Sequence, residues 1–60
     1  MKIVVTYRKN QETEDKILKY GTLVDKLKAP LMPYWILKIE TNKTIDDFLN
    51  IPGVVGVSNN

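Results

Sequence analysis

Histidine and cysteine, the side chains that most often do chemistry at neutral pH, do not occur in this 60-residue sequence. The chain therefore lacks the usual general base, the commonest metal ligand, a thiolate nucleophile and any disulfide. The carboxylates remain, and Asp46 and Asp47 are adjacent, but a place in the first turn of a helix explains them better than a catalytic dyad. The sequence predicts a protein that is not an enzyme and uses no cofactor or metal ion.

The charges of the sequence are nearly balanced and scattered. Nine Lys and Arg residues against seven Asp and Glu residues leave a net charge of +2. Nucleic-acid binders usually show a basic stripe or tail, so this pattern does not favour nucleic acid as the partner. The apolar run after Lys2 is too short for a signal peptide or a membrane span, and the lack of cysteine fits a reducing compartment. We therefore predict a cytoplasmic protein without a membrane contact.

The first half of the chain predicts a strand, a helix and a second strand. Residues 3–7 are rich in β-branched side chains, which are typical of a strand. Asn10 or Thr13 is the predicted cap of a helix that runs to about residue 20. Gly21 is expected in the left-handed conformation after its last turn. Residues 22–27 then alternate as a strand.

The second half predicts the same kinds of element in another order. Residues 34–40 form the strongest predicted strand, with apolar side chains on both faces, which suits a central position. Thr44 and Asp47 resemble a capping box, which predicts a short helix. Pro52-Gly53 ends this helix, and residues 54–57 form a last short strand.

The order strand, helix, strand, strand, helix, strand is that of a ferredoxin-like fold. It predicts one α+β domain over residues 1–60, with a four-stranded antiparallel sheet and two helices on one face. The predicted inward side chains are Ile3, Val5, Leu23, Leu27, Trp35, Leu37, Ile39, Val55 and Val57, beneath Ile17, Leu18, Phe48 and Leu49. Asp25 has the same parity as Leu23 and Leu27, which indicates an irregular edge strand.

The sheet face that the helices leave open is the best candidate for a binding surface. Strand alternation places on it Val4, Thr6, Val24, Ile36 and Lys38, with Tyr34 at its border. A solvated face is normally polar, so apolar residues at its centre favour a protein partner or a homodimer. The alternative is that these are ordinary exposed side chains.

A nucleic-acid binder is a further alternative. Ferredoxin-like domains that bind RNA stack bases on aromatic residues of their central strands. Tyr7, Tyr34 and Trp35 lie in the predicted first and third strands, but Trp35 has the parity of the core residues. One aromatic residue on the open face, without a basic stripe, does not make RNA the expected partner.

The segment over residues 48–57 carries a more specific signal. It runs from the end of a helix through Ile51-Pro52-Gly53-Val54 into the strand Val54-Val55-Gly56-Val57. This segment resembles the closing signature of the subtilisin propeptide and inhibitor family, in which a Leu-Pro-Gly-Val-like turn leads into the last strand. Residues 2–7 and 35–40 are similar to the family's first and third strands.

The resemblance implies an inhibitor or intramolecular chaperone of a subtilisin-like serine protease. In that family the open sheet face packs on the protease, and the C-terminal tail lies in the active site like a cleaved product. By this resemblance Asn60 lies beside the catalytic serine, and Val57 enters an apolar subsite. The predicted partner-binding residues are Val4, Thr6, Tyr34, Ile36, Lys38, Val57, Ser58, Asn59 and Asn60. The alternative is a module that binds another protein or itself without inhibition, such as, by analogy, a phage-encoded protein that targets its host.

Overall fold

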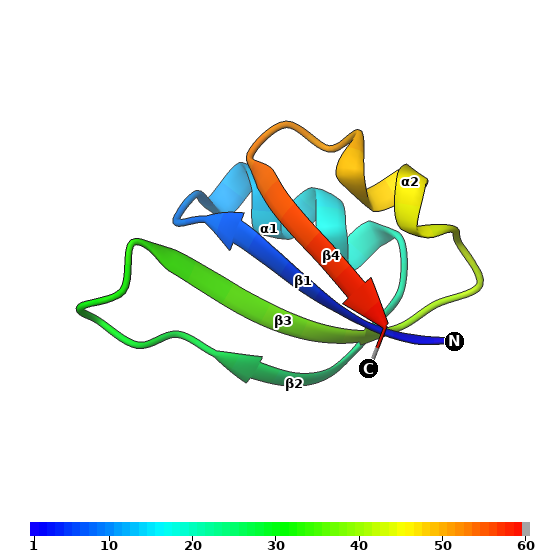
Figure 1. The fold of residues 1–60 in the computed structure, drawn as a ribbon, viewed down its shortest axis with the longest axis horizontal. Coiled ribbons are helices and arrows are strands. Elements are labelled where there is room, and N and C mark those ends of the chain that lie inside the picture. The colour runs from blue at the N-terminus through cyan, green and yellow to red at the C-terminus, as the bar shows by residue number, and fades with distance from the viewer. Residues whose placement is uncertain (60) are drawn as a thin grey trace.

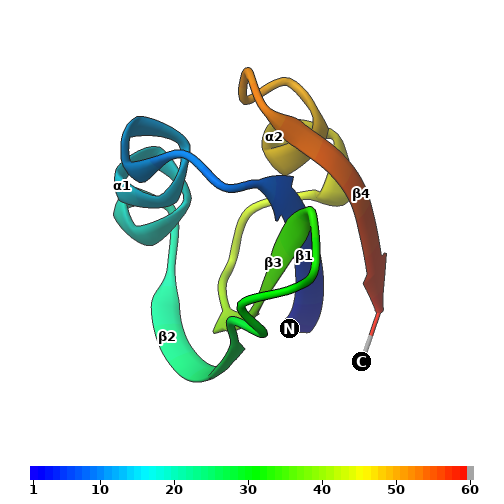
Figure 2. The ribbon, with the colours of Figure 1, turned by 90° about the vertical axis from the view of Figure 1, so that its left-hand side faces the viewer.

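The computed structural model describes residues 1–59 and confirms the predicted order of elements (Figure 1). The elements are β1 (Lys2–Arg8), α1 (Gln11–Lys19), β2 (Thr22–Leu27), β3 (Tyr34–Glu40), α2 (Ile45–Leu49) and β4 (Val54–Asn59). The strands form one antiparallel sheet in the order β2-β3-β1-β4, and Figure 2 shows both helices on the same side of it. This is the predicted α+β, ferredoxin-like arrangement. Neither of these helices is long and apolar enough to span a membrane.

Asn10, not Thr13, caps α1. Its side-chain oxygen accepts hydrogen bonds from the backbone N–H groups of Glu12, at 2.8 Å, and Thr13, at 3.4 Å. Thr13 lies inside the helix, and its hydroxyl donates to the carbonyl oxygen of Pro52 at 2.9 Å. This bond fastens α1 to the turn before β4, where Gly53 adopts a φ of 97° that glycine tolerates without strain.

The predicted capping box of α2 is confirmed. The backbone N–H of Asp47 donates to the Thr44 hydroxyl at 3.2 Å, and the backbone N–H of Thr44 donates to the Asp47 carboxylate at 3.0 Å. Both bonds satisfy N–H groups that a helix cannot pair internally. Asp47 is therefore explained by helix formation, and Asp46 lies in the first turn, where a helix favours negative charge.

One hydrophobic core fills the space between the sheet and the helices. Its buried members are Ile3, Val5, Tyr7, Ile17, Leu37, Ile39, Phe48 and Ile51. Leu18, Trp35 and Val57 pack against this core and are half-buried. Most of the predicted core is thus confirmed, but the prediction omits Tyr7 and Ile51. Tyr7 can be buried because its hydroxyl donates to a carboxylate of α1.

An irregularity in β4 explains why Val55 is not in the core as predicted. Tyr7 pairs with Val54 and Thr6 pairs with Gly56, so Val55 is an extra residue in the ladder. A bulge of this kind shifts the alternation of side chains by one position. Val55 is 45% exposed, and Val54 packs against the core instead.

A second irregularity changes the faces of β2. Its register with β3 shifts between Leu23 and Asp25, with Val24 as the extra residue. Asp25 and Leu27 therefore lie on the open face, and the prediction of Leu27 as a core residue is wrong. Leu23 points to the predicted side of the sheet, but it is not in the core. It is exposed because β2 lies at the edge of the sheet, and the other residues of this strand are exposed as well. Leu49, also predicted in the core, is exposed on α2.

The prediction that Gly21 is left-handed is wrong. Among the described residues only Gly53 has a positive φ. Glycine is needed at position 21 for a different reason. A Cβ atom there would collide with Ile39 Cγ2 and would lie 2.7 Å from the Glu40 carbonyl oxygen. The chain thus passes from α1 into β2 in direct contact with the end of β3.

Candidate protein-binding surface

The open face is the side of the sheet that points away from both helices. The registers place on it Val4 and Thr6 of β1, Ile36 and Lys38 of β3, Asp25 and Leu27 of β2, and Gly56 and Ser58 of β4. One end of the face carries Arg8 paired with Tyr34, and the other carries Lys2 paired with Glu40. Leu27, Ile36 and Val4 thus lie in the middle of the face beside the charged pair Lys38 and Asp25, and further charged residues lie at both ends.

The structure brings onto the open face six residues that the sequence predicts for partner binding, five on β1 and β3 and Ser58 on β4. Val4, Thr6, Ile36 and Lys38 are neighbours on β1 and β3, and each is half-buried by the side chains around it. Tyr34 begins β3 at the edge of the same face and is exposed. Their shared location is confirmed, and their role in binding stays a prediction.

A shallow groove crosses the open face between β1 and the edge strand β2. It is about 250 Å³ in volume and is lined by Val4, Asp25, Lys26, Leu27, Ile36 and Lys38. Leu27 is 60% exposed and widens the apolar centre of the face. The sequence prediction misses Leu27 here because the bulge at Val24 reverses its parity. The one sequence signal of this bulge is Asp25, an acid in a row of side chains predicted to point inward.

The C-terminal residues are part of the sheet and do not form a free tail. Val57 pairs with Val5, Ser58 with Val4, and Asn59 with Ile3, so β4 continues to the end of the described chain. Val57 packs toward the core, while Ser58 lies on the open face. The expectation of a product-like tail is therefore wrong for residues 57–59, because they are already paired with β1. Asn60, the last residue of the predicted tail, lies outside the described residues.

The aromatic residues are divided between the two faces. Trp35 lies on the helix side, where its ring packs edge-on against Tyr7 at 6.2 Å between centroids. The ammonium groups of Lys28 and Lys9 lie 4.6 Å and 5.9 Å from the centre of the indole. Tyr34 is left as the aromatic residue of the open face, so the stacking platform that RNA recognition requires is not assembled there.

On the helix side of the sheet, the Glu14 carboxylate contacts three polar side chains. The Tyr7 hydroxyl donates to Glu14 Oε1 at 2.5 Å, and Lys28 Nζ lies 2.5 Å from the same oxygen. Gln11 donates to the other carboxylate oxygen at 3.3 Å. These contacts connect β1, α1 and the loop before β3. We call Tyr7, Glu14 and Lys28 the Glu14 cluster.

Protonation in the Glu14 cluster fits a structural role. Burial raises the pKa of Tyr7, and the hydrogen bond to Glu14 raises it further. Burial alone would also raise the pKa of Glu14, but the hydrogen bonds from Lys28 and Tyr7 and the charge of Lys28 together lower it. At neutral pH Tyr7 is a neutral donor and Glu14 a charged acceptor, and neither is poised to exchange a proton.

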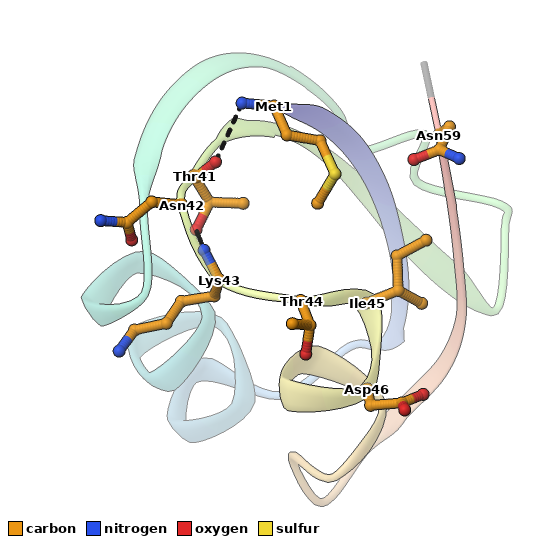
Figure 3. Close-up of a pocket in the computed structure, with 8 residues that line it drawn as sticks. All are labelled: Met1, Thr41, Asn42, Lys43, Thr44, Ile45, Asp46 and Asn59. Atoms are coloured by element: carbon orange, nitrogen blue, oxygen red, sulfur yellow. Dashed lines mark hydrogen bonds between the residues drawn. The ribbon is translucent and has the colours of Figure 1, made fainter.

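A second hollow lies at the end of the sheet where the chain begins (Figure 3). It is about 560 Å³ in volume and is lined mainly by the loop between β3 and α2, with Met1 and Asn59. Two hydrogen bonds join residues of its lining: the Met1 ammonium donates to the Thr41 carbonyl oxygen, and the Lys43 N–H donates to the Thr41 hydroxyl, both at 3.0 Å. The sequence gives no sign of this hollow, because it joins residues that are far apart in the chain.

Neither hollow of the described chain is lined by a buried side-chain polar group that lacks a hydrogen-bond partner. Within residues 1–59 every buried side-chain nitrogen and oxygen has a hydrogen-bond partner. The same residues contain no group of three or more acidic side chains placed to hold a metal ion. No protein-family model, curated protein or solved structure matches the chain. The fold and the open face are therefore the observations from which a function can be inferred.

Proposed function

We propose that this chain is a protein-binding domain and that the open face is its contact surface. The observation that supports this most is the apolar centre of the face, where Leu27 stands beside Ile36 and Val4 around a groove. Burial of an exposed leucine or isoleucine stabilises a complex by about 1.5–3 kcal/mol at most, so a few such side chains supply a large part of a moderate affinity. The helices leave this face free for a partner.

The charges beside the apolar centre support a protein partner more than nucleic acid. Lys38 and Asp25 are paired across β3 and β2, and Lys2 and Glu40 are paired across β1 and β3. Charges of both signs therefore alternate on this face, whereas a phosphate backbone requires a surface of one sign. Mixed charges around an apolar centre are typical of protein interfaces.

Replacement of Ile36 by aspartate tests this proposal. The variant should keep its fold, because Ile36 points away from the core, but it should lose protein binding by about tenfold or more, because a partner would bury the new charge. Leu31→Asp is the matched control, since Leu31 is 98% exposed in the loop before β3. Proteins captured by the immobilised wild type should also be captured by Leu31→Asp and not by Ile36→Asp. Equal capture by all three would contradict the proposal.

Inhibition of a subtilisin-like serine protease is the second candidate function. It is supported by the segment that resembles the propeptide family, because Pro52-Gly53 forms a turn with a left-handed glycine and Val54–Asn59 follows as the last strand. Since residues 57–59 are held in β4, the open face must supply most of the contact in this mechanism.

A panel of subtilisin-like proteases distinguishes this candidate. The full chain should inhibit at least one member, and Ile36→Asp should inhibit it much less. Removal of Asn60 alone leaves β4 whole and moves the terminal carboxylate to Asn59, so any loss of potency in that variant measures the contribution of the Asn60 residue itself. Absence of inhibition by the full chain against every member would rule out this candidate and leave the protein-binding proposal intact.

A further inference from the structure

We infer that the partner of the open face is a second copy of this chain, packed face to face about a two-fold axis that runs parallel to the strands. The inference rests on the proposed function, because it names the occupant of the same surface. Two sheets packed in this way keep their strands within about 30° of each other at a separation of about 10 Å. The registers of the sheet then determine which side chains meet.

The axis follows from the order of the strands. It passes between the two copies, midway between β1 and β3, and therefore places β1 of one copy over β3 of the other. The edge strand β2 of one copy lies over the edge strand β4 of the other. Residues that are register partners within one sheet thus face each other across the interface.

The charges at the ends of the face are complementary in this arrangement. Lys2 faces Glu40 of the second copy, and Glu40 faces Lys2 of the second copy, because the two are register partners. At the opposite end Arg8 faces the aromatic ring of Tyr34, a favourable contact for a guanidinium. The Glu40 side chain is 51% exposed, with the Met1 ammonium 3.4 Å away, so it is accessible to a second cation. A two-fold axis across the strands would instead place Lys2 against Arg8.

The shape of the face gives an independent argument. Leu27, Ile36, Thr6 and Gly56 form one row across the four strands. The proposed axis places Leu27 of each copy over Gly56 of the other. A Cβ at Gly56 would meet no heavy atom of residues 1–59 within 4 Å, and its φ is not positive, so the fold itself does not require glycine there. Glycine within a strand is found at bulges, such as the one at the adjacent Val55, and where another chain approaches closely.

The size of the face suits a weak, reversible dimer. The exposed surface of the chain is 3974 Å², and interfaces at the small end of the range bury about 600 Å² from each partner. That is about 15% of this surface, which one broad side of a molecule of 31 × 20 × 17 Å can supply. The dimer should therefore form and dissociate with protein concentration.

Sedimentation of charge-exchanged variants tests the inference. The average mass of the wild type should rise from that of a monomer to that of a dimer as the protein concentration increases. Lys2→Glu and Glu40→Lys should each weaken dimerisation by about tenfold or more, because each variant opposes two pairs of like charges. An equimolar mixture of the two variants should dimerise again, since every pair across the mixed interface is then Lys against Glu. A mixture that stays monomeric would overturn the proposed axis.

Gly56→Leu gives a second measurement that does not depend on charge. The Cβ of the new residue meets no heavy atom of residues 1–59 within 4 Å, so we expect circular dichroism and thermal unfolding to show a folded protein. Dimerisation should be lost, because the introduced leucine side chain would collide with Leu27 of the second copy. A wild type that stays monomeric at all concentrations overturns the dimer, but leaves the proposed function standing if Ile36→Asp still loses other captured proteins. A dimer that persists in both Ile36→Asp and Gly56→Leu contradicts both proposals.

Discussion

Replacement of Gly21 by alanine should lower the stability of this domain strongly. The new Cβ would collide with Ile39 Cγ2 and would lie 2.7 Å from the Glu40 carbonyl oxygen, and the second of these is backbone of a central strand. Overpacking of this kind costs about 3 kcal/mol when the backbone must move. For a domain of this size that is a fall in Tm of about 12–24 °C.

Gly56→Ala is the matched control for this substitution. It makes the same chemical change in a strand, but its Cβ would meet open space among the described residues. We expect its Tm to equal or slightly exceed that of the wild type, because alanine reduces the freedom of the unfolded chain by about 0.4–1 kcal/mol. Thermal unfolding followed by circular dichroism gives both values. Equal melting of Gly21→Ala and wild type would contradict the close contact between Gly21 and β3.

Replacement of Glu14 by leucine should destabilise the domain by about 2–3 kcal/mol. The Tyr7 hydroxyl, on a fully buried side chain, would lose its acceptor, and Lys28 would lose its ion-pair partner. The effect is smaller than for a fully buried ion pair because the Lys28 side chain is 29% exposed. Glu12→Leu, a change at an exposed position of the same helix, should change the free energy of unfolding only slightly. Unfolding can be followed by the fluorescence of Trp35, the single tryptophan, which lies beside Lys28.

The Glu14 cluster should also make the stability of the wild type sensitive to acid. The folded state holds the pKa of Glu14 below its ordinary value, so the ionised form contributes stability above that ordinary value. This contribution should disappear as the pH falls through the lowered pKa. Thermal unfolding of Glu14→Leu should therefore depend less on pH in the acid range than that of Glu12→Leu. Parallel pH profiles of the two variants would show that Glu14 is not the group that titrates.

The elements could be predicted from the sequence because the residues that begin and end them act locally. Asn10 bonds N–H groups two and three residues away, and Thr44 and Asp47 bond each other across one helical turn. Proline and glycine act through their own backbone angles, as Gly53 does. The order of these elements then leaves few ways to bury one face of the sheet.

The errors in the prediction come from contacts between distant residues. The bulges at Val24 and Val55 depend on how neighbouring strands pair, and each moves a predicted core residue without changing the local pattern. Gly21 is required by contact with β3, and no neighbour in the sequence indicates this. The candidate surface was therefore predictable at Val4 and Ile36, on regular strands, but not at Leu27, which follows a bulge.

The central position of β1 also determines when the domain can form during synthesis. β1 is the earliest of the strands in the chain, yet its two neighbours are β3, residues 34–40, and β4, residues 54–59. Such non-local pairing makes folding slow, because the long connections must be ordered before any strand contact is gained. Until β4 leaves the ribosome, one edge of β1 has no strand partner, and its backbone N–H and C=O groups remain open to pairing with other chains. The first strand to be synthesised thus has both of its edges paired only when the last strand is in place.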